Sequence, residues 1–176
     1  MDQNLDQTVA LLSRTPEALK AFLSGLSDEW TLRNEGEKTW TVFDVVAHLV
    51  YCEKTNWMPR VRQFGKEGAF QRFDRQGHLR EIEGKSLAHQ LAEFASLRRQ
   101  NLDDLRALNL QPADLELRAQ HPTLGQVKLA ELLATWAAHD LTHLHQISRI
   151  MACQYREAVG PFGAFLGVLK CDAHGS

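Results

Sequence analysis

Apolar residues recur every three or four positions along most of the chain, which is typical of amphipathic helices. The pattern predicts two short helices near the N-terminus, over 5–12 and 15–26, and three long ones, over 41–59, 86–105 and 127–155. No segment shows a convincing strand alternation, so we expect an all-α protein. Three long helices and an N-terminal helical segment are the components of a four-helix bundle.

Capping residues indicate where some of these helices begin. Thr15 and Pro16 give the second helix an N-cap and a proline in its first turn, and Thr41 followed by Asp44 resembles a capping box. The segment over 63–84 contains four glycines and many charges. It is too long for a simple connection, so we expect a functional loop or a lid.

Composition and charge exclude several classes of protein. A chain of 176 residues suggests one domain, which we expect over 1–170, with a flexible tail over 171–176. A net charge of −2 argues against a nucleic-acid surface and against strong attraction to anionic lipid. No apolar run is long enough for a membrane span. The polar N-terminus lacks a signal-peptide pattern, so the expected location is cytoplasmic.

Two histidines share one face of the predicted helix over 127–155. Residues four apart differ by only about 40° around a helix axis, so His139 and His143 form one stripe with Trp136 and Gln146. The ends of this stripe are apolar, so it faces the core. Burying imidazoles without partners is costly, and a metal ion would satisfy both. Pairing with carboxylates or with the backbone is the alternative.

His48 has a similar setting on the predicted helix over 41–59, where it shares a face with Val45 and Cys52. A histidine from this helix and the His139/His143 pair can converge inside a bundle. Three neutral nitrogen ligands leave one coordination position open, which is the pattern of a catalytic rather than a structural site.

The remaining histidines and the cysteines carry weaker signals. His145 points away from the stripe, and we expect it, His78 and His89 at the surface. His121, in a proline-containing loop, either lines the site or is unrelated to it. Cys52 is interpreted as a small core residue. Three widely separated cysteines argue against a disulfide framework or a thiolate zinc site.

Asp44 and Tyr51 are candidate catalytic residues on the helix that carries His48. Asp44 lies one turn before His48 and either orients its free ring nitrogen or only caps the helix. Tyr51 is a candidate proton donor near the metal.

Arg98 is the third candidate catalytic residue. It falls on the inward stripe of the helix over 86–105, where it either receives an anionic group of a substrate or packs its stem with the charge in solvent. Asp140, beside His139, either supports that ligand or is a surface carboxylate.

Two segments resemble the DinB-like (DinB/YfiT-type) family: residues 40–49, WTVFDVVAHL, and residues 136–147, WAAHDLTHLHQI. The sequence HPTLG at 121–125 also fits, more loosely. The resemblance implies an up-down-down-up four-helix bundle with one divalent metal ion bound by three histidines. His48, His139 and His143 match those positions. Zinc and nickel are the leading ions, and iron also suits imidazole ligands.

The resemblance also bears on activity and partners. Several members of the family are thiol-dependent transferases, one is a maleylpyruvate isomerase, and many carry a provisional label of metal-dependent hydrolase. It implies a homodimer, a small-molecule substrate and a low-molecular-weight thiol cosubstrate such as bacillithiol, mycothiol or glutathione.

Three functions remain open on the sequence. The first is a metal-dependent enzyme, either a thiol S-transferase or a hydrolase. The second is a non-catalytic stress-response protein with a structural ion, which a fourth ligand such as His121 or Asp44 would favour. The third is a dimeric scaffold with vestigial ligands. The open coordination position favours the enzyme.

Overall fold

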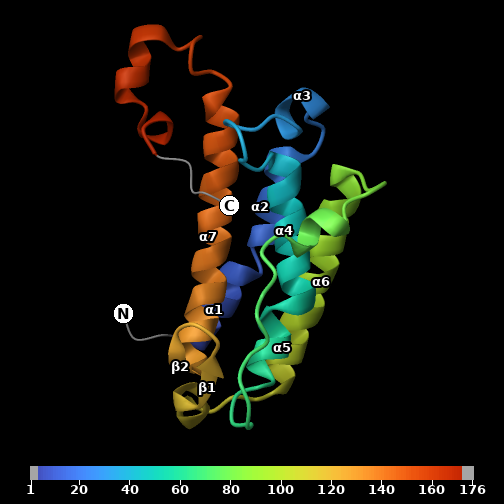
Figure 1. Ribbon diagram of the computed structural model, residues 1–176, viewed down its shortest axis with the longest axis vertical. Helices are drawn as coiled ribbons and strands as arrows, with labels where there is room; N and C mark the ends of the chain where they lie inside the picture. The colour runs from blue at the N-terminus through green and yellow to red at the C-terminus, as the bar shows by residue number, and fades with distance from the viewer. Residues whose placement is uncertain (1–3, 172–176) are drawn as a thin grey trace.

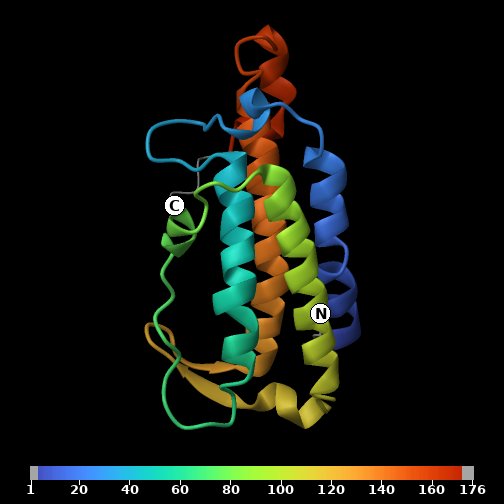
Figure 2. The same ribbon diagram turned by 90° about the vertical axis from the view of Figure 1, so that its right-hand side faces the viewer.

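The computed structural model describes residues 4–171 and confirms the predicted four-helix bundle. Four helical segments lie side by side along the long axis (Figures 1 and 2). They are α1 (Leu5–Leu12) continued by α2 (Thr15–Leu23), then α4 (Val42–Thr55), α6 (Leu87–Ala107) and α7 (Leu129–Cys153). In Figure 2 the first segment runs upward, α4 and α6 run downward and α7 runs upward. The chain therefore has the expected up-down-down-up topology.

Shorter elements connect these segments. The predicted helix over 41–59 is divided at Asn56, so that Pro59 falls in the separate helix α5, and residues 160–169 form turns of 3-10 helix. Residues 1–3 and 172–176, which include nearly all of the expected tail, lie outside the described residues. No helix in the described part of the chain has the length and apolar character needed to cross a membrane. The short helices are α3 (Asp28–Thr31), α5 (Trp57–Val61), η1 (Gly77–Arg80), η2 (Pro112–Glu116), η3 (Gly160–Phe165) and η4 (Gly167–Leu169).

The expected capping box fixes the start of α4. The Thr41 hydroxyl accepts a hydrogen bond from the Asp44 backbone N–H at 3.1 Å, and the Asp44 carboxylate accepts one from the Thr41 backbone N–H at 2.9 Å. Ser86 caps α6 through a 3.2 Å hydrogen bond from the His89 backbone N–H. Such caps satisfy donors that have no partner inside the helix. The first of them sets the register that carries His48 to the core face of α4.

Two clusters of buried apolar side chains hold α4 against α7. One contains Trp57 and Trp136, whose stacked rings have centroids 5.6 Å apart. The other contains Val46, Phe94 and Ile147, which are fully buried. Burial of one such side chain is worth about 1.5–3 kcal/mol, so the clusters fix the spacing of the helices that carry the histidines.

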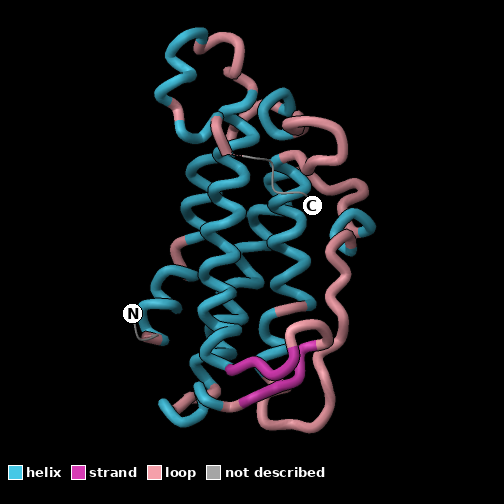
Figure 3. Tube along the Cα trace, turned by 60° about the vertical axis from the view of Figure 1, so that its left-hand side comes forward, coloured by secondary structure: helices cyan, strands magenta, loops and turns pink. Residues whose placement is uncertain are grey.

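The structure contains a short β-hairpin that the sequence pattern does not predict. An antiparallel hairpin of β1 (Arg118–His121) and β2 (Gly125–Lys128) precedes α7 (Figure 3), so the expectation of no strands is wrong there. Each strand has four residues, which is too short to show a clear alternation. Gly125 has φ +76°, a conformation that L side chains rarely adopt, and it lets the chain turn back into β2.

Residues 62–86, here called the strap, run back along the outside of the bundle from α5 to α6 (Figure 2). Phe70 donates its backbone N–H to the Gln120 carbonyl at 2.9 Å, which ties the strap to the hairpin. A Cβ on Gly77 would lie 2.2 Å from a ring carbon of Tyr51, so only glycine allows the strap to approach α4 this closely. The segment with the expected lid thus lies against α4; whether it opens and closes stays a prediction.

Candidate metal centre

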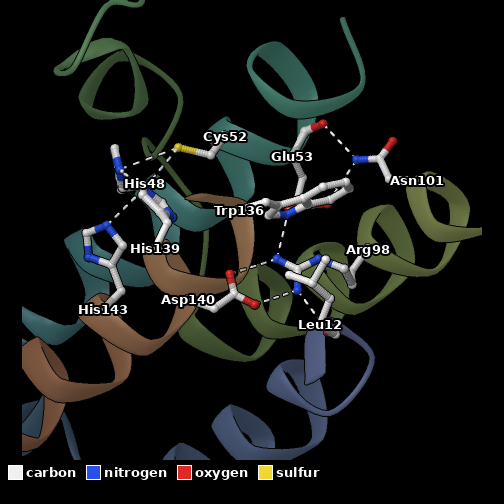
Figure 4. A network of polar contacts seen from close by, with 10 residues as sticks. All are labelled: Leu12, His48, Cys52, Glu53, Arg98, Asn101, Trp136, His139, Asp140 and His143. Atoms are coloured by element: carbon white, nitrogen blue, oxygen red, sulfur yellow. Dashed lines mark hydrogen bonds and ion pairs between the residues drawn. The ribbon is translucent and has the colours of Figure 1, made fainter. Parts of the chain in front are cut away.

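The structure brings His48, His139 and His143 together where α4 faces α7 (Figure 4). Nε2 of His139 lies 3.3 Å from Nε2 of His48 and 3.1 Å from Nε2 of His143. All three ligand atoms lie within 4.8 Å of one another. These are the three residues that the sequence predicts as metal ligands.

The separations of these nitrogen atoms fit a single small cation. A tetrahedral zinc ion with Zn–N bonds of about 2.0–2.1 Å places its nitrogen ligands about 3.3 Å apart. The separations of 3.3 and 3.1 Å at His139 are close to that edge length. Hydrogen bonds among the three nitrogen atoms cannot satisfy them all, because a proton shared by two of them leaves the third without a partner. One cation can accept all three lone pairs.

Burial keeps the three imidazoles neutral, which is the form that binds metal. It lowers the pKa of His48 to about 2, with His143 and His139 adding to the effect. Burial and then His143 lower the pKa of His139 to about 3. The pKa of His143 is lowered as well, again chiefly by burial. None of the three rings therefore takes up a second proton at neutral pH, so each keeps one nitrogen lone pair for a metal ion.

Gln146 fixes the tautomer of His143. The two side chains form a 2.8 Å hydrogen bond between His143 Nδ1 and the Gln146 amide oxygen. A carbonyl oxygen only accepts, so Nδ1 carries the proton and donates it. The lone pair of His143 is thereby left on Nε2, the atom that faces the other two histidines.

Cys52 lies closer to the site than the sequence analysis assumed. Its sulfur is 3.4 Å from His48 Nε2 and 3.9 Å from His139 Nε2. The side chain is 1% exposed, as expected of a core residue. Burial and the carboxylates of Glu53 and Asp140 raise the pKa of the Cys52 thiol. The sulfur stands at one side of the histidines and does not join the set whose ligand atoms all lie within 4.8 Å.

A buried ion network underlies the histidines (Figure 4). Arg98 donates to both oxygens of Asp140, at 2.6 and 2.9 Å, and to Glu53 at 2.9 Å. It also donates to the Leu12 backbone carbonyl at 2.8 Å. The three ionic side chains are at most 1% exposed. The guanidinium therefore does not face the cavity, and the structure gives it protein partners in place of the anticipated substrate group.

Glu53 links the same network to two further side chains. It accepts hydrogen bonds from the Trp136 indole at 3.0 Å and from the Asn101 amide at 2.9 Å. The network thus joins α1, α4, α6 and α7. Asp140 follows His139 along the chain, and Glu53 follows Cys52. The network therefore links α4 and α7, the two helices that carry the histidines. Glu53 was not a candidate from the sequence, since a glutamate beside a core face usually reaches solvent.

Asp44 and Tyr51 take positions outside the histidine cluster. The Asp44 carboxylate accepts hydrogen bonds from the backbone N–H and the hydroxyl of Thr41, which corresponds to the capping alternative. His48 Nδ1 has no hydrogen-bond partner among the described residues. Tyr51 packs on Phe73 of the strap with ring centroids 5.6 Å apart. It lines a neighbouring hollow rather than the cavity at the histidines.

The prediction that His78 lies at the surface is wrong. It is 0% exposed, and its ring lies 4.6 Å from that of Trp40 and 5.3 Å from that of His48, between centroids. The strap buries it against α4, and no local pattern in the sequence signals such a long-range contact. His89 and His145 are exposed, as expected.

A cavity of about 680 Å³ opens from the histidines, which lie in its wall. His121 of the hairpin also lines it, which was one of the two alternatives for that residue. Its Nδ1 accepts hydrogen bonds from the backbone N–H groups of Thr123 and Leu124, both at 3.2 Å, so this nitrogen is used inside the loop. The arrangement is a ligand set at the wall of a space large enough for a small molecule.

Comparisons with known proteins agree with this fold. A structure of YfiT from Bacillus subtilis, described as a probable metal-dependent hydrolase with an unusual four-helix bundle topology, is similar with a TM-score of 0.71. The two chains are 21% identical, and the match covers 90% of each, which shows a shared fold. No curated protein matches this chain. The family model of the DinB superfamily matches residues 11–147, a segment that contains all three clustered histidines. The chain therefore belongs to the DinB superfamily.

Proposed function

We propose that this protein is a metal-dependent enzyme acting on a small molecule, with one divalent ion held by His48, His139 and His143. The convergence of three neutral imidazole nitrogens at the wall of an open cavity carries the proposal. When bound, such an ion lowers the pKa of a coordinated water or thiol and holds the resulting anion. Zinc and nickel suit three imidazole ligands best, and iron is the next choice.

The residues around the histidines prepare the site for a cation. Gln146 leaves the His143 lone pair on Nε2. The buried network contains two carboxylates, Glu53 and Asp140, and one guanidinium, so its formal charge is −1. A buried negative charge near the site lowers the energy of a bound cation. The centroid of the Trp40 ring lies 4.8 Å from that of the His48 ring, and Trp40 forms part of the cavity wall beside the histidines.

Two reactions fit this arrangement, and both use the open coordination position. A hydrolase would activate water for attack on an ester or amide, and the description of YfiT supports that choice. A thiol S-transferase would activate a low-molecular-weight thiol for attack on an electrophile, as in several members of the family. The cavity has room for either pair of reactants.

The position of Cys52 supports a second candidate, a structural metal site. If its sulfur, 3.4 Å from His48 Nε2, bound the ion, the coordination would be closed. Absorption spectra of the cobalt-loaded protein separate the two. A thiolate charge-transfer band that Cys52→Ala abolishes would identify a closed site. A spectrum that is independent of Cys52 and changes when 2-mercaptoethanol is added would identify an open one.

For the enzyme, we expect turnover that depends on the histidines. Zinc- or nickel-loaded protein should hydrolyse members of a nitrophenyl ester panel or accelerate the reaction of a thiol with monobromobimane. His139→Ala should fall to the rate of chelator-treated protein, because it removes the central ligand. His145→Ala is the matched control, an exposed histidine on the same helix. Equal rates for the wild type and His139→Ala would rule out the proposed site.

A further inference from the structure

The cavity at the histidines has a strongly one-sided charge. Arg60, Arg72 and Arg75 line it, and among residues 4–171 no aspartate or glutamate side chain does. The whole chain has 22 acidic and 20 basic residues, so this local excess does not reflect the composition. A concave surface lined by one sign of charge attracts ligands of the opposite sign.

These three arginines have no carboxylate partner among residues 4–171, whereas their neighbours along the chain do. Arg62 pairs with Asp104, and Arg80 of the strap pairs with Asp74 at 2.5 Å. By contrast, Arg60 donates a 3.4 Å hydrogen bond to the Gln71 carbonyl, and its guanidinium lies 5.2 Å from the centroid of the Phe70 ring. Arg60 is half-buried, whereas Arg72 and Arg75 are exposed. A guanidinium without a counter-ion keeps its capacity to bind an anion.

The three arginines share the wall of this cavity with the clustered histidines and with His121. Arg60 lies on α5, and Arg72 and Arg75 lie on the strap. Arg60 and Arg72 also line an adjoining hollow of about 500 Å³, which shares Asn56 with the first cavity. The positive charges thus extend from the histidines into a second space.

Asn56 provides an independent sign of a ligand in this region. Its side chain is 7% exposed and lines both hollows, and its amide oxygen has no hydrogen-bond partner in the described part of the chain. Buried amides are normally hydrogen-bonded, so an unpaired amide oxygen at a cavity wall indicates a hydrogen-bond donor, such as an O–H or N–H group, supplied from outside the protein. Asn56 stands where α4 ends and the helix carrying Arg60 begins.

We infer that the molecule processed at the metal centre carries an anionic oxygen group, a carboxylate or a phosphate, that Arg60, Arg72 and Arg75 bind. This inference rests on the proposed function and adds the substrate class to it. The reacting end of the molecule lies at the histidines, and its anionic end lies toward the adjoining hollow. Arg98, which the sequence offered for this role, is occupied by Asp140 and Glu53.

Calorimetric titration of the zinc-loaded protein tests the inference. Mercaptosuccinate, a thiol with two carboxylates, and thioglycerol, a neutral thiol, are the main probes; succinate and inorganic phosphate are titrated without a thiol. We expect mercaptosuccinate to bind more tightly than thioglycerol. Arg72→Gln and Arg75→Gln should each weaken its binding about tenfold, because a charge-assisted hydrogen bond is lost. Thioglycerol binding should not change.

Arg99→Gln is the matched control, since Arg99 is exposed on α6 and does not line either hollow. Preferential binding of succinate or of phosphate identifies the anionic group. Wild-type affinity for mercaptosuccinate in Arg72→Gln and Arg75→Gln, or no binding of any anion to the wild type, would overturn the inference. Failure of the proposed metal chemistry gives a different result. Thioglycerol would then leave the spectrum of the cobalt-loaded protein unchanged, while succinate would still bind to the arginines.

Discussion

Arg98→Met is expected to destabilise the protein by about 3–5 kcal/mol, the cost of breaking a buried ion pair from one side. The substitution leaves the carboxylates of Asp140 and Glu53 without their cation, and both side chains are 0% exposed. It also removes the hydrogen bond to the Leu12 carbonyl, which joins the N-terminal segment to the bundle. The free energy of unfolding, measured by denaturation in urea, gives the size of the effect.

Arg99→Met provides the control for this prediction. It makes the same chemical change at the next residue of the same helix, where the side chain is exposed, so the effect should stay within about 0.5 kcal/mol. Arg98→Lys keeps the charge but not the planar fork that contacts both oxygens of Asp140, and should fall between the two. A stable Arg98→Met protein would show that the network is not the joint between the four helical segments.

Removing the metal should lower the melting temperature of the wild-type protein by about 8–16 °C. A ligand present at about a thousand times its dissociation constant stabilises the native state by roughly 4 kcal/mol. For a chain of this length, each 1 kcal/mol corresponds to about 2–4 °C. Scanning calorimetry of the metal-loaded protein, with and without a chelator, measures the shift.

The same experiment on two variants assigns the shift to the histidines. His139→Ala should melt at the same temperature with and without chelator, because its site no longer holds the ion. His145→Ala, with an exposed histidine on the same helix, should keep the full difference. A chelator effect that survives in His139→Ala would place the ion elsewhere, and no effect in the wild type would favour a scaffold with vestigial ligands.

The sequence predicted the bundle and the histidine cluster because both depend on helical periodicity. The apolar ends of the stripe through His139 and His143 fix its direction, and the capping box at Thr41 sets the register of His48. Two regular helices packed face to face leave little freedom in where such side chains point. The motif resemblance then supplied the pairing of the two helices.

Other features depend on contacts between distant segments, which periodicity does not reveal. The burial of His78 follows from the path of the strap, which is irregular and is held to α4 by the close approach at Gly77. The inward position of Arg98 could be predicted, but its partners Glu53 and Asp140 come from two other helices. The hairpin was missed because its strands are too short to show a period. The homodimer, the cytoplasmic location and the limits of the domain stay predictions.

Elemental analysis of the purified protein tests the central claim most directly, with His48→Ala and His139→Ala beside the wild type. The structure leads us to expect about one equivalent of zinc, nickel or iron in the wild type, from a single three-histidine set, and its loss in both variants. His145→Ala should retain the ion. A wild-type protein that holds no metal after reconstitution, or variants that hold as much as the wild type, would contradict the account.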